Sequence, residues 1–219
     1  MGAVSETTPP RRGRPRAFDR EEALAAATRL FWERGYEATS IGDLTEAMGI
    51  RPGSLYAAFG DKKSLFREVV RVYGGTPTGA FIGRALTEEP SARAAVARML
   101  REAAANYACP SHPAGCLTIS AATNVSRQDA EVQDFLCDLR TANIEAFESR
   151  LFTAEQAGEL PAGTDARSLA AYFAAVLQGM SQRARDGATP QELAATAELA
   201  LAAWPETAGP GKAGAAGGS

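Results

Sequence analysis

The stretch Ser40–Phe59, SIGDLTEAMGIRPGSLYAAF, predicts two short helices joined by a tight turn. The first helix carries Ile41, Leu44 and Met48 at the three- and four-residue spacings of a single apolar face. Gly49 then permits the left-handed backbone that ends this helix and redirects the chain within about three residues. This spacing is typical of a helix-turn-helix.

The second helix of the pair combines a narrow apolar face with an exposed tip. It begins near Arg51 or Pro52, where proline is well tolerated, and Leu55 and Phe59 hold it to the core. The residues left facing outward are Arg51, Pro52, Gly53, Ser54, Tyr56 and Ala58. A short helix with such a tip is suited to entering a DNA major groove.

Helices are predicted on both sides of this motif. Asp19 is the expected N-cap of a helix that runs to about Arg34, and Asp61 is that of a helix that runs to about Tyr73. Ser40 is the expected N-cap of the first motif helix. Three helices and a fourth outgoing one form a compact headpiece.

Residues 13–70 resemble the DNA-binding domain of the tetracycline-repressor (TetR) family. The resemblance rests on the order and spacing of three segments: the LF…RGY..TS run that starts at Leu30, the segment DLTEAMGI, and the ending SLYAAFGDKKSLF. It implies an all-helical homodimer that represses transcription. It further implies that DNA is released when a small molecule enters a larger C-terminal domain.

The resemblance also suggests individual DNA contacts. Lys62 occupies the position of a phosphate-binding lysine, Tyr56 that of a tyrosine that contacts the backbone, and Ser54 that of a small hydroxyl residue. Arg51 is the expected base reader, because a guanidinium can bond both acceptors of a guanine edge; a phosphate contact is its alternative. The full predicted set is Arg14, Arg16, Thr39, Ser40, Arg51, Pro52, Gly53, Ser54, Tyr56 and Lys62, with Lys63 as a secondary phosphate candidate.

Pro52 and Ala58 depart from the polar and larger residues common at their positions in the family. Few direct hydrogen bonds to base edges are therefore expected. Contact with thymine methyl groups, or DNA shape, then supplies more of the specificity.

The formal charge is -3 at pH 7, but the charges are unevenly placed. Four arginines precede the first helix within six residues that contain no acid, namely Arg11, Arg12, Arg14 and Arg16. Such an arm can follow phosphates or enter a minor groove, although a solvated tail is the alternative. Beside a helix-turn-helix, we favour DNA contact.

The chain divides into four predicted parts. Residues 1–9 are a disordered N-terminus, 10–74 the helix-turn-helix domain, 75–204 a ligand-binding and dimerisation domain, and 205–219 a disordered, small-residue tail. Helices are predicted in the third part at 78–87, 91–108, 116–124, 128–156, 165–186 and 190–203. The fold class is all-α.

The last two predicted helices each carry an apolar stripe, formed by Leu169, Phe173, Val176, Leu177 and Met180 in one and including Leu193 and Leu201 in the other. The resemblance implies that these stripes pair with their copies in a homodimer. Periodicity alone leaves open that they close the core of a single chain.

No effector-binding residue is assigned. Large side chains that are candidates for a cavity wall, or simply for the core, are Phe81, Met99, Tyr107, Phe135, Phe147, Tyr172 and Met180. The identity of the small-molecule effector is not encoded in any motif.

Cys109, His112 and Cys116 have a spacing compatible with a metal site, and the cysteines also allow a thiol-redox switch. This makes a metal- or redox-sensing repressor the alternative function. Buried structural cysteines are the simpler interpretation, because free cysteine is among the most buried residue types. No metal or cofactor is therefore expected.

Other function classes receive little support from the sequence. It has no Gly-x-Ser-x-Gly elbow, glycine-rich phosphate loop or HExxH pair, and only one histidine, so catalysis is not expected. A helical protein-binding module is a remote alternative. No apolar run is long enough to span a bilayer and no signal-peptide pattern is present, so a cytoplasmic protein without a membrane partner is expected. The expected partners are an operator in double-stranded DNA and a second copy of the chain.

Overall fold

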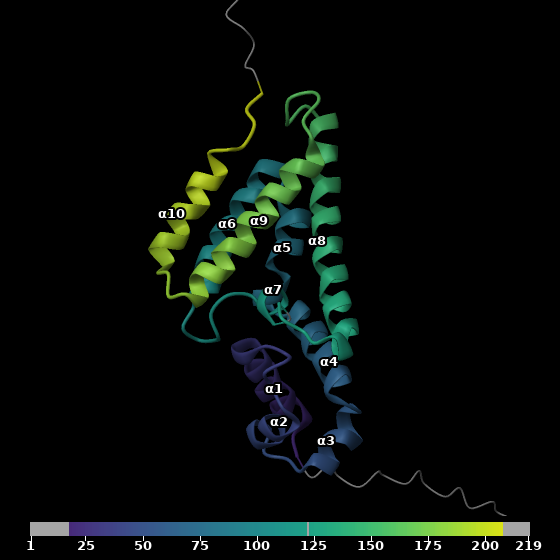
Figure 1. The fold of residues 1–219 in the computed structure, drawn as a ribbon. Coiled ribbons are helices and arrows are strands. Elements are labelled where there is room, and N and C mark those ends of the chain that lie inside the picture. The colour runs from purple at the N-terminus through teal and green to yellow at the C-terminus, as the bar shows by residue number, and fades with distance from the viewer. Residues whose placement is uncertain (1–17, 122, 208–219) are drawn as a thin grey trace, which may run out of the picture.

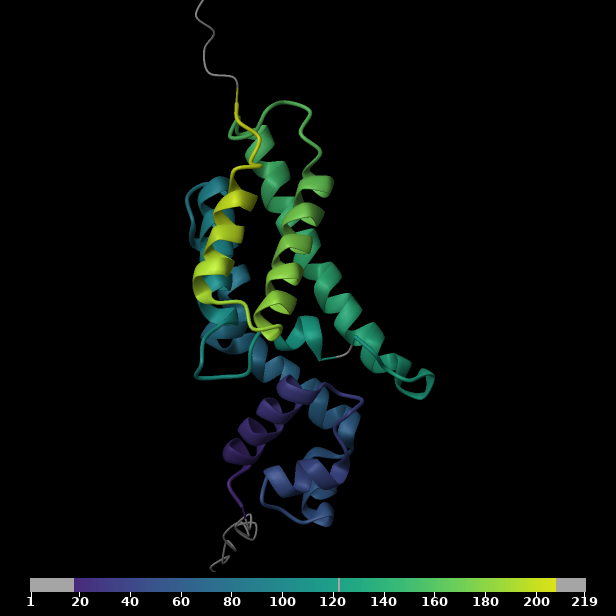
Figure 2. The same ribbon diagram turned by 60° about the vertical axis from the view of Figure 1, so that its left-hand side comes forward.

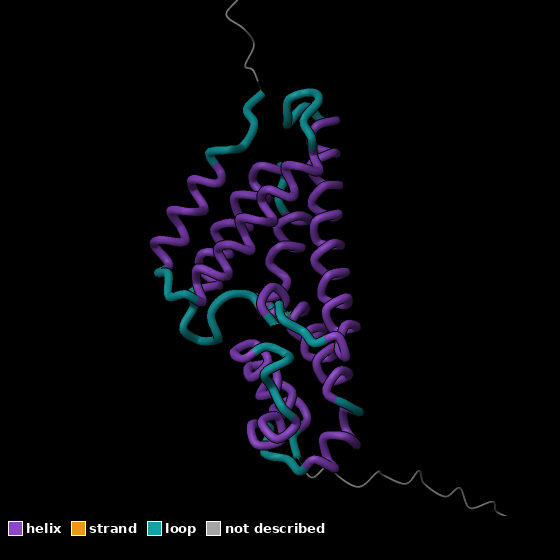
Figure 3. Tube along the Cα trace, in the orientation of Figure 1, coloured by secondary structure: helices purple, strands orange, loops and turns teal. Residues whose placement is uncertain are grey.

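The computed structural model describes residues 18–121 and 123–207. The described part of the chain is helical and contains no strand (Figure 3). Its α-helices are α1 (Arg20–Arg34), α2 (Ile41–Ala47), α3 (Pro52–Phe59), α4 (Lys62–Gly75), α5 (Pro77–Glu88), α6 (Ala92–Tyr107), α7 (Leu117–Ser120), α8 (Ala130–Gln156), α9 (Ala166–Arg185) and α10 (Pro190–Leu201). A 3-10 turn, Arg127–Asp129, precedes α8. The all-α fold class is confirmed.

Helices α1 to α4 form the headpiece at the lower end of Figure 1. Its centre is aromatic: Phe31 and Tyr36 each lie edge-on to Phe66, with ring centroids 5.1 Å apart in both pairs. Arg20 of α1 also pairs with Glu68 of α4 at 2.6 Å. The headpiece therefore has a core of its own on which α2 and α3 are mounted.

The larger helical unit contains α5, α6, α8, α9 and α10. Helix α6 contacts both α5 and α10, while α8 and α9 pack against one another. Figure 2 shows α9 and α10 side by side on the face turned toward the viewer. Met99, Phe147 and Phe173 are among the buried side chains that these helices share.

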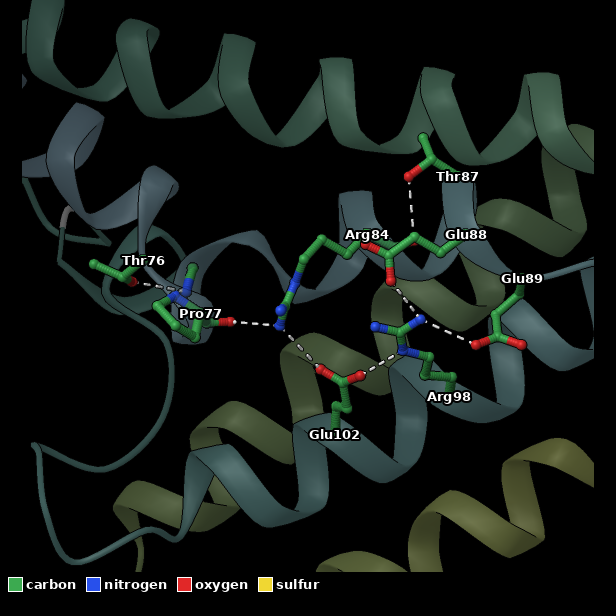
Figure 4. Close-up of polar contacts among 9 residues, drawn as sticks. Thr76, Pro77, Arg84, Thr87, Glu88, Glu89, Arg98 and Glu102 are labelled. Carbon is green, nitrogen blue, oxygen red and sulfur yellow. Dashed lines mark hydrogen bonds and ion pairs between the residues drawn. The ribbon is translucent and has the colours of Figure 1, made fainter.

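An arginine in α6 connects the end of α5 to the middle of α6 (Figure 4). The Arg98 guanidinium lies 2.8 Å from a Glu88 carboxylate oxygen, 3.0 Å from Glu89 and 2.6 Å from Glu102. These three carboxylates raise the pKa of Arg98. The cluster fixes the α5–α6 corner and faces solvent, so it serves the scaffold.

The headpiece and the larger unit meet through α4, α7 and the loop after α1. The Tyr36 N–H donates to the Ala121 carbonyl at 2.7 Å, and the Tyr73 hydroxyl donates to Cys116 Sγ at 3.5 Å. Arg185 at the end of α9 donates to the Trp32 carbonyl at 3.1 Å. These contacts seat the headpiece directly beneath the larger unit.

One predicted helix is much shorter than expected. The range 116–124 contains only the four-residue α7, Leu117–Ser120. The Ala121 carbonyl, which a continuing helix would use internally, instead accepts the Tyr36 N–H, and Asn124 and Ser126 favour turns over helix interiors. The tertiary contact ends the helix.

The predicted dimer stripes close the core of the single chain. Phe173, Leu177, Met180, Leu193 and Leu201 are all buried among neighbouring helices. Leu169 and Val176 are half-buried against the same core. Contact with neighbouring helices of the same chain already covers the five buried side chains, which are therefore not available to a second copy. A dimer contact at the half-buried Leu169 and Val176 stays a prediction.

No described helix is both long and apolar enough to cross a membrane. The predicted disordered termini fall almost entirely on residues 1–17 and 208–219, outside the described part of the chain. Helix α4 ends at Gly75 and Thr76 caps α5, so the predicted domain boundary at residues 74 and 75 falls at the end of α4; the division into domains stays a prediction.

Candidate nucleic-acid interface

The turn between α2 and α3 is set by a capped helix and a glycine. Ser40 and Asp43 form a capping box in which the Asp43 N–H donates to Ser40 Oγ at 3.1 Å and the Ser40 N–H donates to Asp43 Oδ2 at 2.8 Å. The Ser40 hydroxyl and the Ser40 N–H both donate to the Asp43 carboxylate, and these two bonds lower the pKa of Asp43. At the other end of α2, Gly49 has φ 64°, the left-handed conformation that favours glycine.

Helix α3 projects from the headpiece on two buried side chains. Leu55 and Phe59 lie in the core, while Arg51 is the N-cap and Pro52 the first helical residue. Because α3 has only eight residues, these two anchors leave most of its circumference uncovered.

The predicted reading surface of α3 is accessible. Tyr56 is 51% exposed, which is unusual for a large aromatic side chain. Arg51, Pro52 and Gly53 are exposed and Ser54 is half-buried. The structure thus brings together five of the predicted DNA-binding residues at the N-terminal end of α3, where four of them are exposed.

Lys62 lies at the first position of α4, directly after the Asp61 N-cap. Its Nζ lies 4.2 Å from the centroid of the Tyr36 ring, a cation–π contact that holds the ammonium near the α3–α4 corner. Partial burial lowers the pKa of Lys62, and the carboxylates of Glu37 and Asp129 partly offset this effect. Its position beside α3 suits a phosphate contact.

Thr39 and Ser40, two of the predicted DNA-binding residues, use their hydroxyls in hydrogen bonds within the headpiece. Thr39 is fully buried and its Oγ1 donates to the Gly35 carbonyl at 2.7 Å, so the prediction that this side chain binds phosphate is wrong. The position of Thr39 directly before the motif predicts an exposed hydroxyl, whereas the fold turns this hydroxyl inward to the end of α1. Ser40 is exposed, with its hydroxyl in the capping box.

Lys63 points away from the candidate DNA surface. Its Nζ lies 3.1 Å from Asp129 and 3.6 Å from Glu131, at the start of α8. The Asp129 hydrogen bond raises the pKa of Lys63. The secondary phosphate role predicted for Lys63 is therefore replaced by a contact between the headpiece and the larger unit. Arg14 and Arg16 lie outside the described residues.

Cys109, His112 and Cys116 do not converge. The His112 ring stacks on Trp32 with centroids 4.7 Å apart, Cys109 Sγ is 3.1 Å from Ser111 Oγ, and Cys116 is buried beside α4. Across residues 18–121 and 123–207, no group of three or more His, Cys, Asp or Glu side chains is arranged to hold a metal ion. The geometry gives the metal-sensing alternative no support.

The larger unit contains a narrow cavity of about 60 Å³ between α5, α6, α8 and α9. Met99 and Phe147 line it, as expected for a cavity wall. Cys116 also reaches this cavity, although the sequence did not indicate it. Of the other aromatic and sulfur candidates, Phe81, Tyr107 and Met180 are core residues, Tyr172 is exposed, and Phe135 lines a neighbouring groove.

Comparison with known proteins agrees with this geometry. A family model described as bacterial regulatory proteins, tetR family, matches residues 23–69. A second, described as tetracyclin repressor-like, C-terminal domain, matches residues 90–199. Together the two models cover both structural units.

Similar proteins extend over nearly the whole chain. The HTH-type transcriptional repressor ComR of Escherichia coli K12 is 35% identical over 195 residues, 89% of this chain and 93% of ComR. The HTH-type transcriptional repressor BdcR of the same organism is 32% identical over 188 residues, 86% of this chain and 90% of BdcR.

A solved structure provides the link to DNA. A cysteine mutant of the TetR family transcriptional regulator CifR, complexed with 26-bp double-strand operator DNA, is 44% identical with a TM-score of 0.84. The match covers 88% of this chain and 100% of the CifR chain. The helix-turn-helix headpiece, the two family models and these relatives agree: the chain belongs to the tetR family of bacterial regulatory proteins, which are DNA-binding transcriptional regulators and not enzymes.

Proposed function

We propose that this chain is a transcriptional repressor that binds a palindromic operator as a homodimer and releases it when a small molecule binds the larger unit. The observation that carries the proposal is the exposed tip of α3, mounted on Leu55 and Phe59 with Lys62 beside it. The relatives ComR and BdcR are named as repressors, which supports the same direction of regulation. Such a protein acts in the cytoplasm, where bacterial DNA lies.

Helix α3 enters the major groove, and its residues make different contacts there. Arg51 bonds a guanine edge, worth about 1 to 3 kcal/mol of discrimination. Pro52 and Gly53 allow close approach, and Ser54 and Tyr56 bond the phosphate backbone. Since the tip offers few hydrogen-bond donors, DNA shape contributes part of the specificity.

Dimerisation uses the outer face of α9 and α10, in place of the buried stripes. Leu199 of α10 is 75% exposed and Tyr172 of α9 is 41% exposed. Ala175 and Gly179 lie on the exposed side of α9 and leave room for a partner helix to approach closely. A twofold axis through this face would present two α3 helices to half-sites about one helical turn, or a multiple of it, apart.

Ligand release requires a connection between the larger unit and the headpiece. Cys116 lines the narrow cavity, and its Sγ also accepts a hydrogen bond from the Tyr73 hydroxyl of α4. A ligand that favours a different α4 position would move the α3 tip out of register with its half-site. Release depends on a difference in affinity of the ligand for the two forms, because equal affinity would shift nothing.

The experiment is a selection of bound duplexes from a random library, followed by anisotropy titrations of the selected operator at several salt concentrations. The proposal predicts a palindromic consensus and an affinity that falls steeply with salt, because phosphate contacts release counterions. Recovery of no consensus, or binding insensitive to salt, would contradict it.

A further inference from the structure

A wide groove lies between α4, α5 and α8 and has a volume of about 1190 Å³. Figure 1 shows these three helices next to one another where the headpiece meets the larger unit. Much of the groove wall is apolar and comes from all three helices, with Val70, Tyr73, Ala80, Phe135 and Leu139 among the lining residues. The groove is large enough for a drug-sized molecule.

Three arginines also line this groove: Arg67 and Arg71, one turn apart on α4, and Arg84 of α5. The carboxylate that lines it with them, Glu68, is engaged by Arg20 at 2.6 Å. The groove wall therefore carries an excess of positive charge.

The three guanidiniums are incompletely paired. Within the described part of the chain, Arg71 has no carboxylate oxygen within 4.0 Å, the distance that defines an ion pair. Arg67 is held by Glu131 at 3.3 Å, but the Glu131 side chain is 65% exposed. Such exposed pairs contribute little stability, and their partners are readily exchanged.

Arg84 adds a buried donor without a partner. Its Nη2 lies 3.6 Å from Glu102 and donates to the Pro77 carbonyl at 3.2 Å, as Figure 4 shows. Its Nε is buried and has no hydrogen-bond partner among the described residues. A buried donor without an acceptor costs free energy that an anionic ligand would recover.

The arginine-bearing groove adjoins the narrow cavity of the larger unit. Thr118 and Asn143 line both spaces. Beyond them most of the cavity wall is apolar, with Ile82, Met99 and Leu177, although Arg140 and Gln178 also line it. A molecule lying across this boundary would meet cations at one end and hydrocarbon at the other.

We propose that the effector site of this protein is the combined groove and cavity, and that its ligand is an amphipathic carboxylate. Arg71 and Arg84 bind the carboxylate, and the apolar walls take the hydrocarbon body. An uncharged analogue would leave the Arg71 guanidinium without a counter-ion. This proposal rests on ligand release as stated under the proposed function and specifies the chemistry of that ligand.

The same groove gives the ligand access to the contact between headpiece and larger unit. Arg67 reaches across to Glu131 and also lies over the Phe135 ring, 5.9 Å from its centroid. A bound carboxylate competes with Glu131 for Arg67. Because α4 begins with Lys62 beside α3, loosening the α4–α8 contact changes the position of the DNA-reading tip.

The test uses decanoate as the probe and decanol as its uncharged counterpart, with binding to the DNA-free full chain measured by calorimetry. Decanoate is expected to bind at least tenfold more tightly than decanol. Arg71→Gln and Arg84→Gln are each expected to weaken the binding of decanoate at least tenfold. The matched control is Arg93→Gln, an exposed arginine of α6 that lines neither space, and it should change nothing.

Thermal melts establish that each variant is folded. Equal binding of decanoate and decanol, no binding of decanoate, or unchanged binding by Arg71→Gln would overturn the proposed site. Release of operator DNA is measured separately. Arginine-dependent binding without DNA release would leave the anion site standing and instead count against ligand release as the function.

Discussion

At the scale of single residues, the exposed side chains of α3 and the start of α4 carry distinct tasks. Arg51 caps α3 and is exposed, so Arg51→Ala should relax preference at one base position while changing affinity for other sequences little. The discrimination lost at that position should be about 1 to 3 kcal/mol. Library selection with the variant measures it, and a uniform loss of affinity would show that Arg51 binds phosphate.

Lys62 should show the opposite pattern. Its ammonium is placed beside α3 by the Tyr36 ring, and it has no base-reading geometry of its own. Lys62→Ala is expected to weaken all duplexes alike and to reduce the slope of log affinity against log salt by about one unit. Anisotropy titrations over a salt series test this, with Arg93→Ala as the control; an unchanged slope would remove Lys62 from the phosphate contacts.

The burial of a side chain can be predicted from the sequence where it depends on local spacing. Leu55 and Phe59 were predicted as anchors from their spacing alone, and both are buried. Thr39 and Lys63 do not have the predicted phosphate-binding positions, because the folded chain buries Thr39 and pairs Lys63 with a distant carboxylate. Lys63 meets Asp129, far along the chain, and no local pattern indicates such a pair.

At the scale of elements, the contact between the start of α4 and the start of α8 joins the two structural units. Lys63 pairs with Asp129 and Glu131, and Arg67 with Glu131. Lys63→Asp should therefore lower the melting temperature by about 1 to 3 °C, as expected for a partly exposed pair. Adding Asp129→Lys should restore part of the loss.

Thermal melts of the two single variants and the double variant form the cycle that isolates this pair. Additive losses in the double variant would show that the Lys63–Asp129 contact does not stabilise the fold. The Arg29–Glu33 pair, exposed within α1, provides a control swap that does not join two units.

The helices themselves were largely predictable, because capping residues and apolar periodicity are local. Helix α5 was predicted at 78–87 and spans Pro77–Glu88, and α8 was predicted at 128–156 and spans Ala130–Gln156. The sequence does not show whether the apolar stripes of α9 and α10 pack within one chain or against a second copy. A face buried by the same chain and a face buried by a second copy have the same period.

At the scale of the whole molecule, the exposed face of α9 and α10 is the expected contact with a second copy. Leu199→Glu places a charge at its most exposed large hydrophobic side chain. The variant should elute with the mass of one chain where the unmodified protein has the mass of two, as measured by light scattering. Its operator affinity should fall at least tenfold, because the two half-sites are then bound independently.

Val72→Glu is the matched control for this change. Val72 lies on α4 and is 45% exposed, so a charge there should leave the mass unchanged. A dimer that persists in Leu199→Glu would place the interface elsewhere. Loss of the dimer in both variants would point to a general effect of the added charge.

Methylation protection with dimethyl sulfate shows whether α3 lies in the major groove of the operator. The reagent methylates guanine N7 in the major groove and adenine N3 in the minor groove. If α3 enters the major groove, guanine N7 should be protected in two half-sites about one helical turn, or a multiple of it, apart, and Arg51→Ala should lose protection at one guanine. Protection confined to adenine N3, or an unchanged guanine pattern in the variant, would contradict this placement of α3.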